Sequence, residues 1–472
     1  MDKKYQRILV GVFSLVFFIT APLIILYALG FRFDDRKFQF VETGSLVIRS
    51  YPKDVLIELD GKPTNKPTPA VISHIVPGTH RVRLELPEYA PWEKDIFISP
   101  QVTTFAEHIQ LFPAILMQDP ISSTLSTENF FPSHRLRYAV EIQKNEIVLK
   151  NIQTPIGTSI EQRTIANLAP REIFSDLLWA KSEKKIFLKT SNRAIVFVIS
   201  RNDQLVDIKK MLNFLPDKCE WHPSDDALLL CARKKELWLV DIALMRSTLL
   251  YTGTIAHPRI DEYTLFLPIH DTTSSSKNAA DTRWVILTID LKNPHLPPYR
   301  HFDIPIFEQD AEFKVGKNYY SIYFPLKQQW FLLPRNIQSD ETKFMPIFSF
   351  TSEKVEHLTW NGNHTKALYI NKGVLWYLDT AFQQFVPPVE LGNVQPGIQS
   401  LVWMPGDRHI LVVYTHAVDV IETDLNTPPL TRTLIQRATP INPIEPLTDG
   451  KWLYLHVSDG SHPGIVRFRI RP

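Results

Sequence analysis

The chain has 472 residues, of which 44% are hydrophobic and 11% aromatic, and its 52 Lys and Arg nearly balance its 50 Asp and Glu. This length exceeds one average domain, and the hydrophobic content suffices for packed cores, so global disorder is excluded. No run of like charges provides the electrostatic footprint of a nucleic-acid surface, and we expect no nucleic-acid partner. The 36 prolines and many aromatic residues favour short strands over long helices.

Residues 8–31 form a mainly apolar run without a charged side chain. A bilayer core requires about 20 such residues in a helix, so the run predicts one transmembrane helix, with 1–7 as a cytoplasmic tail and 32–43 as a linker. Pro22 is tolerated in membrane helices. A cleavable signal peptide is the alternative, but its apolar region spans only about 7–15 residues. We therefore predict an uncleaved, single-pass anchor.

The orientation of this helix depends on its charged flanks. Each flank carries three basic residues, namely Lys3, Lys4 and Arg7 before the run and Arg32, Arg36 and Lys37 after it. The positive-inside rule counts Lys and Arg, and on that count the flanks tie. The short N-terminal tail leaves little to translocate if it stays inside. This favours a cytoplasmic N-terminus and an extracytoplasmic body.

From residue 44 to residue 112 the chain alternates apolar and polar positions, as half-buried strands do. Asp60-Gly61 is a short-hairpin signal and Pro77-Gly78 is a turn signal. The alternation predicts a compact all-β module of about 70 residues, because strands of this length bury one face only.

Several marks occur in this segment in a fixed order: Gly44-Ser45-Leu46-Val47-Ile48, Ser50-Tyr51-Pro52, Asp60-Gly61, Thr68-Pro69, Pro77-Gly78 and Tyr89-Ala90-Pro91-Trp92. With these marks the segment resembles the PEGA domain family. The family usually has Gly at the position of Glu88, so the local turn departs from the pattern. The resemblance implies a small β-sandwich-like module, common in bacterial surface proteins, that serves interaction or spacing. It implies a bacterial envelope protein and no enzymatic activity.

Residues 113–472 contain a repeat that is centred on tryptophan. Segments around Trp179, Trp221, Trp360 and Trp403 superimpose, and the first pair is 42 residues apart and the second pair 43. Repeats of about 40–50 residues with several strands each are typical of a β-propeller. Weaker units in the gaps give seven or eight blades. We expect the last unit to be completed by a strand from near Pro113, which would close the ring.

Two turns of this repeat resemble the W-S-P-D-G turn of TolB-like propellers. They are Trp221-His222-Pro223-Ser224-Asp225-Asp226 and Trp403-Met404-Pro405-Gly406-Asp407. The resemblance concerns the fold, since propellers host binding, scaffolding and catalysis alike.

The chain shows no nucleophile-elbow, metalloprotease or phosphate-loop motif, and we predict no catalytic residue, no cofactor and no metal site. His74, His80 and His270 lack partners at metal-ligand spacing and are interpreted as solvated loop or strand residues. Four acidic residues end strands of the repeat, namely Asp241, Asp290, Asp379 and Asp424. They are either a carboxylate ring at a channel mouth or, as we favour, acceptors of turn hydrogen bonds. The repeated tryptophans are expected between blades and not as a sugar platform.

The two cysteines, Cys219 and Cys231, bracket the turn that follows Trp221. In an antiparallel hairpin centred on Asp225 they would face each other at a separation that a disulfide can span. Such a bond persists outside the cytoplasm. Two buried thiols are the alternative, since a bulge in the turn would break the register, and the sequence leaves both open.

The sequence therefore predicts an all-β protein with an N-terminal transmembrane helix, a PEGA-like β-sandwich module at 44–112 and a seven- or eight-bladed β-propeller at 113–472. We expect a membrane-anchored extracytoplasmic binding or scaffold protein of the cell envelope, not an enzyme. Its propeller face would bind a protein or glycan partner. The alternatives are a propeller hydrolase or lyase with a channel-centred active site, and a purely structural spacer.

Overall fold

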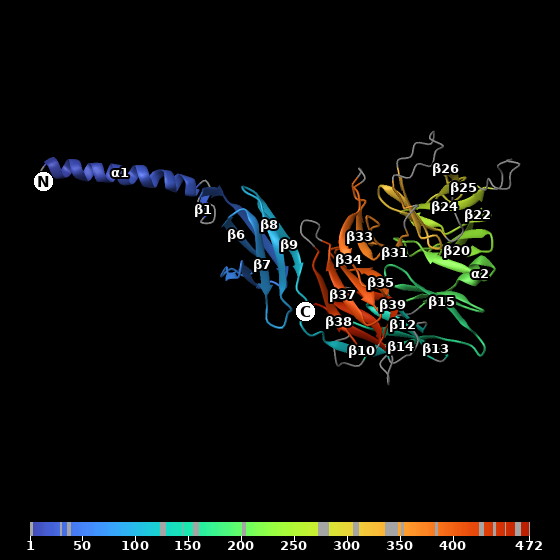
Figure 1. Ribbon diagram of the computed structural model, residues 1–472. Coiled ribbons are helices and arrows are strands. Elements are labelled where there is room, and N and C mark those ends of the chain that lie inside the picture. The colour runs from blue at the N-terminus through green and yellow to red at the C-terminus, as the bar shows by residue number, and fades with distance from the viewer. Residues whose placement is uncertain are drawn as a thin grey trace.

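The computed structural model shows an apolar helix, a small β module and a large β body in succession along the chain (Figure 1). The residues it describes are 3–28, 31–34, 39–122, 129–143, 145–153, 160–200, 204–271, 283–304, 311–335, 348–350, 354–382, 386–423, 429–437, 440–448, 450–457 and 464–471. The helix projects away from the body, and the module lies between them.

Helix α1 spans Lys3–Ala28 and includes Pro22. Its stretch from Leu9 to Leu26 has a mean hydropathy of 2.7 and none of it is buried inside the protein. By length and composition this helix can cross a bilayer. The described part of the chain buries none of this stretch, and an apolar surrounding such as a bilayer core would spare the cost of exposing it to water.

The segment after the helix differs from the linker predicted at 32–43. The apolar run was expected to reach Phe31, but α1 ends at Ala28 and Phe31 begins a hairpin of β1 (Phe31–Asp34) and β2 (Gln39–Glu42). Phenylalanines alternate with polar residues along β1, which is the period of a β-strand.

The module is built from two sheets, with strand orders β6-β3-β9 and β5-β4-β7-β8. Strands β3 and β9 pair in parallel, and the other pairs are antiparallel. Leu46, Ile48, Val82 and Ile98 are among the buried residues that the two sheets enclose. The strands are β3 (Gly44–Tyr51), β4 (Leu56–Leu59), β5 (Lys62–Pro63), β6 (Ala70–Ile75), β7 (Gly78–Glu85), β8 (Trp92–Ile98) and β9 (Thr103–Gln110).

The turn at Glu88 is retained despite its departure from the family pattern. Glu88 has a φ of 68°, in the left-handed region that glycine adopts without strain. Its carbonyl accepts a hydrogen bond from the Ala114 N–H at 2.8 Å, which connects the module to the start of the body. The usual glycine of the family is explained by this conformation.

The remaining described strands form eight four-stranded antiparallel sheets, and the first strands of several successive sheets contact each other, as around the axis of a β-propeller. The expected propeller is thereby confirmed. The sheets are β11 (Phe130–Pro132), β12 (Tyr138–Gln143), β13 (Glu146–Asn151), β14 (Gln162–Asn167); β15 (Phe174–Trp179), β16 (Lys185–Thr190), β17 (Ala194–Val198), β18 (Gln204–Asp207); β19 (Lys218–Trp221), β20 (Leu228–Arg233), β21 (Glu236–Asp241), β22 (Arg246–Thr252); β23 (Arg259–Asp261), β24 (Thr264–Asp271), β25 (Arg283–Asp290), β26 (Tyr299–Ile304); β27 (Glu312–Val315), β28 (Tyr319–Phe324), β29 (Gln329–Pro334), β30 (Phe348–Phe350); β31 (Glu356–Trp360), β32 (Lys366–Asn371), β33 (Val374–Asp379), β34 (Val389–Asn393); β35 (Ile398–Trp403), β36 (His409–Tyr414), β37 (Ala417–Glu422), β38 (Thr431–Gln436); and β39 (Ile441–Thr448), β40 (Trp452–Val457), β41 (Gly464–Arg469) with β10 (Gln118–Ser122). A short helix, α2 (Ile208–Leu212), follows β18.

The repeated tryptophans connect each blade to the one before it. The indole N–H of Trp179 donates to the Phe131 carbonyl at 2.9 Å, and that of Trp221 donates to the Leu178 carbonyl at 3.0 Å. Both bonds run from the first strand of one sheet to the first strand of the preceding sheet. A buried indole N–H needs such an acceptor, so the bonds fix the stacking of neighbouring blades.

The other two repeat tryptophans make ring contacts to the preceding sheet. Trp360 lies edge-to-face with Trp330, with ring centres 5.8 Å apart, and Trp403 lies edge-to-face with Tyr377 at 6.3 Å. All four therefore have the blade-to-blade role that the sequence predicted.

The ring closes by pairing the first strand of the body with the last. Strand β10 pairs antiparallel with β41, which confirms the closing strand expected from near Pro113. The buried Arg467 guanidinium donates to Asp119 Oδ2 at 2.6 and 3.0 Å and to the Ile152 carbonyl at 2.6 Å. It also lies 4.5 Å from the centre of the Trp452 ring. One side chain thus joins the closing strand, the last sheet and the first sheet.

Arg467→Ala leaves the Asp119 carboxylate without its buried partner, and we expect a loss of about 3–5 kcal/mol in the free energy of unfolding. The measurement is denaturant unfolding of the full-length protein in detergent. Arg246→Ala is the matched control, because its ion pair to Asp241 is long, at 3.9 Å, and exposed. The control should change stability by less than about 1 kcal/mol. Equal losses in the two variants would contradict a closing role for Arg467.

Candidate functional site at the junction of module and propeller

The acidic residues that end the repeat strands accept turn hydrogen bonds. Asp241 accepts from the Leu244 N–H and Asp379 from the Ala381 N–H, at 2.9 and 2.8 Å. Asp290 accepts at 2.9 Å from both the Lys292 N–H and the Asn293 side chain, and these bonds lower the pKa of its carboxyl. The turn interpretation is confirmed for these three, while Asp424 lies outside the described residues.

The histidines considered from sequence do not converge. His80 bridges a turn, with Nδ1 at 2.7 Å from Asp60 Oδ2 and Nε2 at 2.6 Å from the Val76 carbonyl. His270 packs edge-on against Trp284, and the 272–282 loop that follows lies outside the described residues. His74 is an exposed residue of β6 with a φ of 64°. Among the residues that the structure describes, no cluster of three or more His, Cys, Asp or Glu could hold a metal.

Cys219 and Cys231 are direct cross-strand neighbours in the β19–β20 register, with Cα atoms 4.1 Å apart and a disulfide between them. Both side chains are buried beside Trp221 and Leu229. The turn between them keeps the register that the sequence required, without a bulge in the pairing. The bond belongs to the core of one blade.

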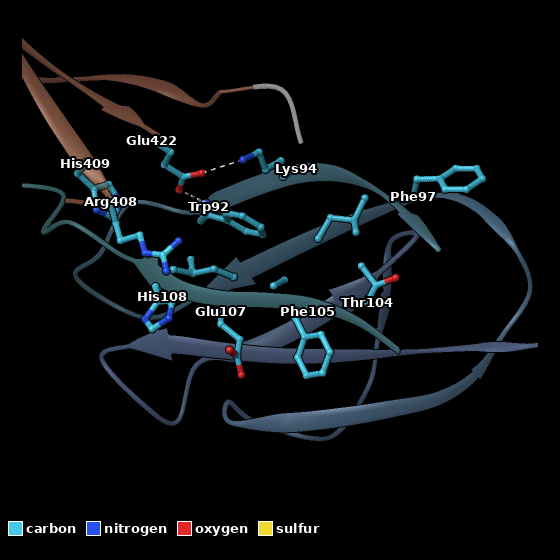
Figure 2. Close-up of a pocket in the computed structure, with 13 residues that line it drawn as sticks. Trp92, Lys94, Phe97, Thr104, Phe105, Glu107, His108, Arg408, His409 and Glu422 are labelled. Carbon is cyan, nitrogen blue, oxygen red and sulfur yellow. Dashed lines mark hydrogen bonds and ion pairs between the residues drawn. The ribbon is translucent and has the colours of Figure 1, made fainter. Parts of the chain in front are cut away.

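A cavity of about 470 Å³ lies where the module meets the propeller (Figure 2). A volume of this size is within the range of about 300–1,000 Å³ that ligand sites occupy. We call it the junction cleft. Its lining comes from strands β8 and β9 of the module and from three propeller residues: Trp92, Lys94, Ile96, Phe97, Thr104, Phe105, Ala106, Glu107, His108, Ile109, Arg408, His409 and Glu422.

Glu422, at the end of β37, holds the two walls of the cleft together. Its carboxylate accepts from the Trp92 indole at 2.6 Å and from the Lys94 ammonium at 2.9 Å (Figure 2). The side chains of Lys94 and Glu422 are only 6% and 13% exposed. A pair this buried gains little net stability over apolar packing but strongly disfavours separation of its partners. The module and propeller are therefore fixed to each other here.

His409 forms the floor between the walls. It is 4% exposed, stands opposite Glu422 in the β36–β37 register and packs edge-on against Phe112. Burial, followed by the positive charges of Arg471, Lys94 and Arg408, lowers the pKa of His409 to about 4. The imidazole is therefore neutral at physiological pH.

Strand β9 bulges where it passes this floor. Ile48 pairs with Ala106 and Ser50 with Ile109, so Glu107 and His108 together oppose Arg49 alone. Bulges of this kind redirect side chains and are frequent beside functional sites. His108 has a φ of 65°, an uncommon conformation for a residue that is not glycine.

A second cavity, of about 840 Å³, lies on the other side of the bulge. Among the described residues, Arg49, Lys53, Arg408 and Arg471 line it, against the one carboxylate of Glu107. Glu107 is already paired with Arg49 at 3.1 Å. Arg408 is exposed and lines both cavities. The region where the cavities meet is therefore positively charged.

Sequence reasoning missed this site, because it expected binding on a propeller face. The two walls lie more than 300 positions apart in the chain, and no local pattern joins them. One signal existed: buried and exposed positions alternate strictly along β8, and Lys94 occupies a buried one. A lysine in the buried phase of a strand requires an acidic partner from elsewhere.

Comparison with known proteins supports the parts of this arrangement. The PEGA domain family matches residues 43–110. No curated protein matches the chain. A crystal structure of the eukaryotic initiation factor is 12% identical with a TM-score of 0.51, covering 75% of this chain and 93% of that one.

Two further structures resemble the chain more weakly. Porphyromonas gingivalis dipeptidyl peptidase 4 is 10% identical with a TM-score of 0.47, covering 73% of this chain and 59% of that one. The Myceliophteria thermophila Cps50 (Swd1) β-propeller domain is 10% identical with a TM-score of 0.38, covering 67% and 99%. At such identities a likeness concerns the fold alone.

The disulfide predicts a redox-sensitive stability. Full-length protein recovered from the envelope should show no free thiol when denatured, and two after reduction. Reduction should lower the free energy of unfolding by about 3 kcal/mol, because the bond restricts the freedom of the unfolded chain. The double variant Cys219→Ala, Cys231→Ala should be insensitive to reductant. Two free thiols in the untreated protein would contradict the bond.

The buried His409 predicts a loss of stability in acid. The unfolded chain protonates this histidine below about pH 6.5. The folded protein resists protonation down to about pH 4. Stability is therefore fully present above pH 6.5 and falls by up to about 3 kcal/mol as the pH drops toward 4. His409→Gln should flatten this part of the unfolding profile, whereas His416→Gln, at an exposed position, should not. If the stability of His409→Gln and of the wild type depended on pH in the same way, His409 would not be the cause of the acid-induced loss of stability.

Proposed function

We propose that the chain is a membrane-anchored extracytoplasmic scaffold of the bacterial envelope that binds a protein partner and catalyses no reaction. The observation that carries this proposal is the fixed junction. Glu422 ties the propeller to the module by two buried hydrogen bonds, and the module directly follows the apolar helix. A rigid module between an anchor and a propeller holds the binding body at a set distance from the bilayer.

The match to the PEGA domain family supports an envelope location, since such modules are common in bacterial surface proteins. The two flanks of the helix carry equal numbers of basic residues, so the flanking charge does not decide the orientation. The short N-terminal tail favours an N-terminus inside and a body outside. The propeller supports binding because its loops and edges offer broad, rigid surfaces.

A channel-centred hydrolase or lyase would require carboxylates or histidines free to converge on the axis. The three described strand-end carboxylates are instead engaged in turn hydrogen bonds. These contacts favour the scaffold over the enzyme as the working hypothesis.

Protease treatment of intact spheroplasts tests the location. We expect the body to be digested from outside, leaving a protected fragment of the helix, while a cytosolic control protein stays intact. A chain without residues 1–31 should be recovered in the soluble fraction. Digestion only after lysis would place the body in the cytoplasm and refute the extracytoplasmic scaffold.

A further inference from the structure

The junction cleft lies between two open sheet edges. In the strand orders of the module, β8 ends one sheet and β9 ends the other, and within the described residues no strand pairs with their outer sides. The cleft runs between these two edges (Figure 2). Long open edges are usually covered or charged, because they attract another strand.

The register of β9 shows which backbone groups are open. The Ser45 N–H donates to the Val102 carbonyl at 3.2 Å, and Ser45 lies opposite Thr103 in the parallel pair. This geometry directs the backbone groups of Val102 and Thr104 toward β3. Because these groups alternate along a strand, those of Thr103 and Phe105 point out of the edge.

Both edges carry apolar surface, since Phe97 belongs to β8 and Phe105 to β9. Phe97 and Phe105 are 63% and 59% exposed, and both line the cleft. An added strand places its side chains directly beside those of its neighbour, so an apolar residue of a partner would pack against Phe105. Paired main-chain bonds give affinity in this binding mode, and the side-chain pockets give specificity.

The propeller end of the cleft is complementary to negative charge. The Arg408 side chain enters the space between Trp92 and His108 (Figure 2), and no carboxylate of a described residue forms an ion pair with it. The second cavity adds Lys53 and Arg471 next to it. Lys94, by contrast, is neutralised by Glu422. An acidic group at this end would find a guanidinium that forms no ion pair with a described residue.

We propose that the junction cleft binds an extended peptide segment of a partner protein, added as a strand to the edge of β9, with an acidic residue against Arg408. The inference rests on the proposed scaffold role and names its partner chemistry. The bulge at Glu107 and His108 ends the regular edge and sets where the acidic residue lies. The propeller thereby contributes the charge, and the module the strand edge.

A phage-displayed library of random octapeptides, panned on the full-length protein in detergent, tests the proposal. Enriched peptides should alternate apolar residues and carry Asp or Glu at one end. They are then synthesised with a fluorescent label, and their dissociation constants are measured by anisotropy, each beside an analogue with Gln or Asn at the acidic position.

Two pairs of variants separate the contributions. Phe105→Pro removes the outward N–H but keeps the pairing with β3, and should weaken binding at least about tenfold, whereas Phe105→Ala keeps the N–H and should cost less. Arg408→Gln should weaken the acidic peptide about tenfold and abolish its advantage over the neutral analogue. Arg135→Gln, exposed elsewhere on the propeller, should leave both affinities unchanged. Thr103→Pro has the same outward geometry and replaces Phe105→Pro if that variant unfolds.

Two results would overturn the proposal. One is that the library yields no more peptides on the wild type than on Phe105→Pro, once thermal unfolding has shown that this variant is folded. The other is that Arg408→Gln leaves the affinity of the enriched peptides unchanged. Polygalacturonate is the competing probe. If this anionic polysaccharide binds, and its binding is abolished by Arg408→Gln but preserved in Phe105→Pro, the ligand of the cleft is a glycan and not a peptide strand. These measurements use purified protein and do not depend on the location of the body in the cell. A failure of peptide binding therefore does not change the protease result, and a failure of the protease test does not change the peptide result.

Discussion

The pairing of β10 with β41 is the constraint on which the rest of the body depends. A propeller whose first and last blades are not joined exposes two blade faces to water, and its apolar contacts are lost on both sides. Here the closing strand comes from the N-terminal side of the ring, and the buried Arg467 links it to Asp119 and to the carbonyl of Ile152. Inside the closed ring, each repeat tryptophan fixes a blade to its predecessor.

Much of this architecture could be predicted because short stretches of the sequence encode it. The apolar run of the helix, the ordered marks of the module and the spacing between Trp179 and Trp221 each lie within one stretch of chain. Period-two alternation and a repeat of about 40 residues depend on the backbone geometry of strands and blades alone. Hairpin symmetry also predicted that Cys219 and Cys231 could face each other, while the sequence left open whether they form a disulfide or two buried thiols.

The junction could not be predicted in the same way, because its parts lie far apart in the sequence. Lys94 and Glu422 are 328 positions apart, and their pairing requires both the module fold and the position of β37. The β1–β2 hairpin was missed for a different reason: its alternation is short and lies beside charges that suggested a membrane flank. The buried phase of Lys94 on β8 was the one local sign of a distant partner.

The Glu422 contacts also determine how the molecule carries mechanical force. The chain enters the propeller through β10, the outermost strand of its sheet, so tension from a membrane anchor would pull first on the strand that closes the ring. The hydrogen bonds from Trp92 and Lys94 to Glu422 provide a parallel path into β37, an interior strand of the preceding sheet. Load is thus shared between the closing strand and an interior strand. If the chain is pulled through its N-terminal helix, the ring stays closed as long as the hydrogen bonds to Glu422 hold.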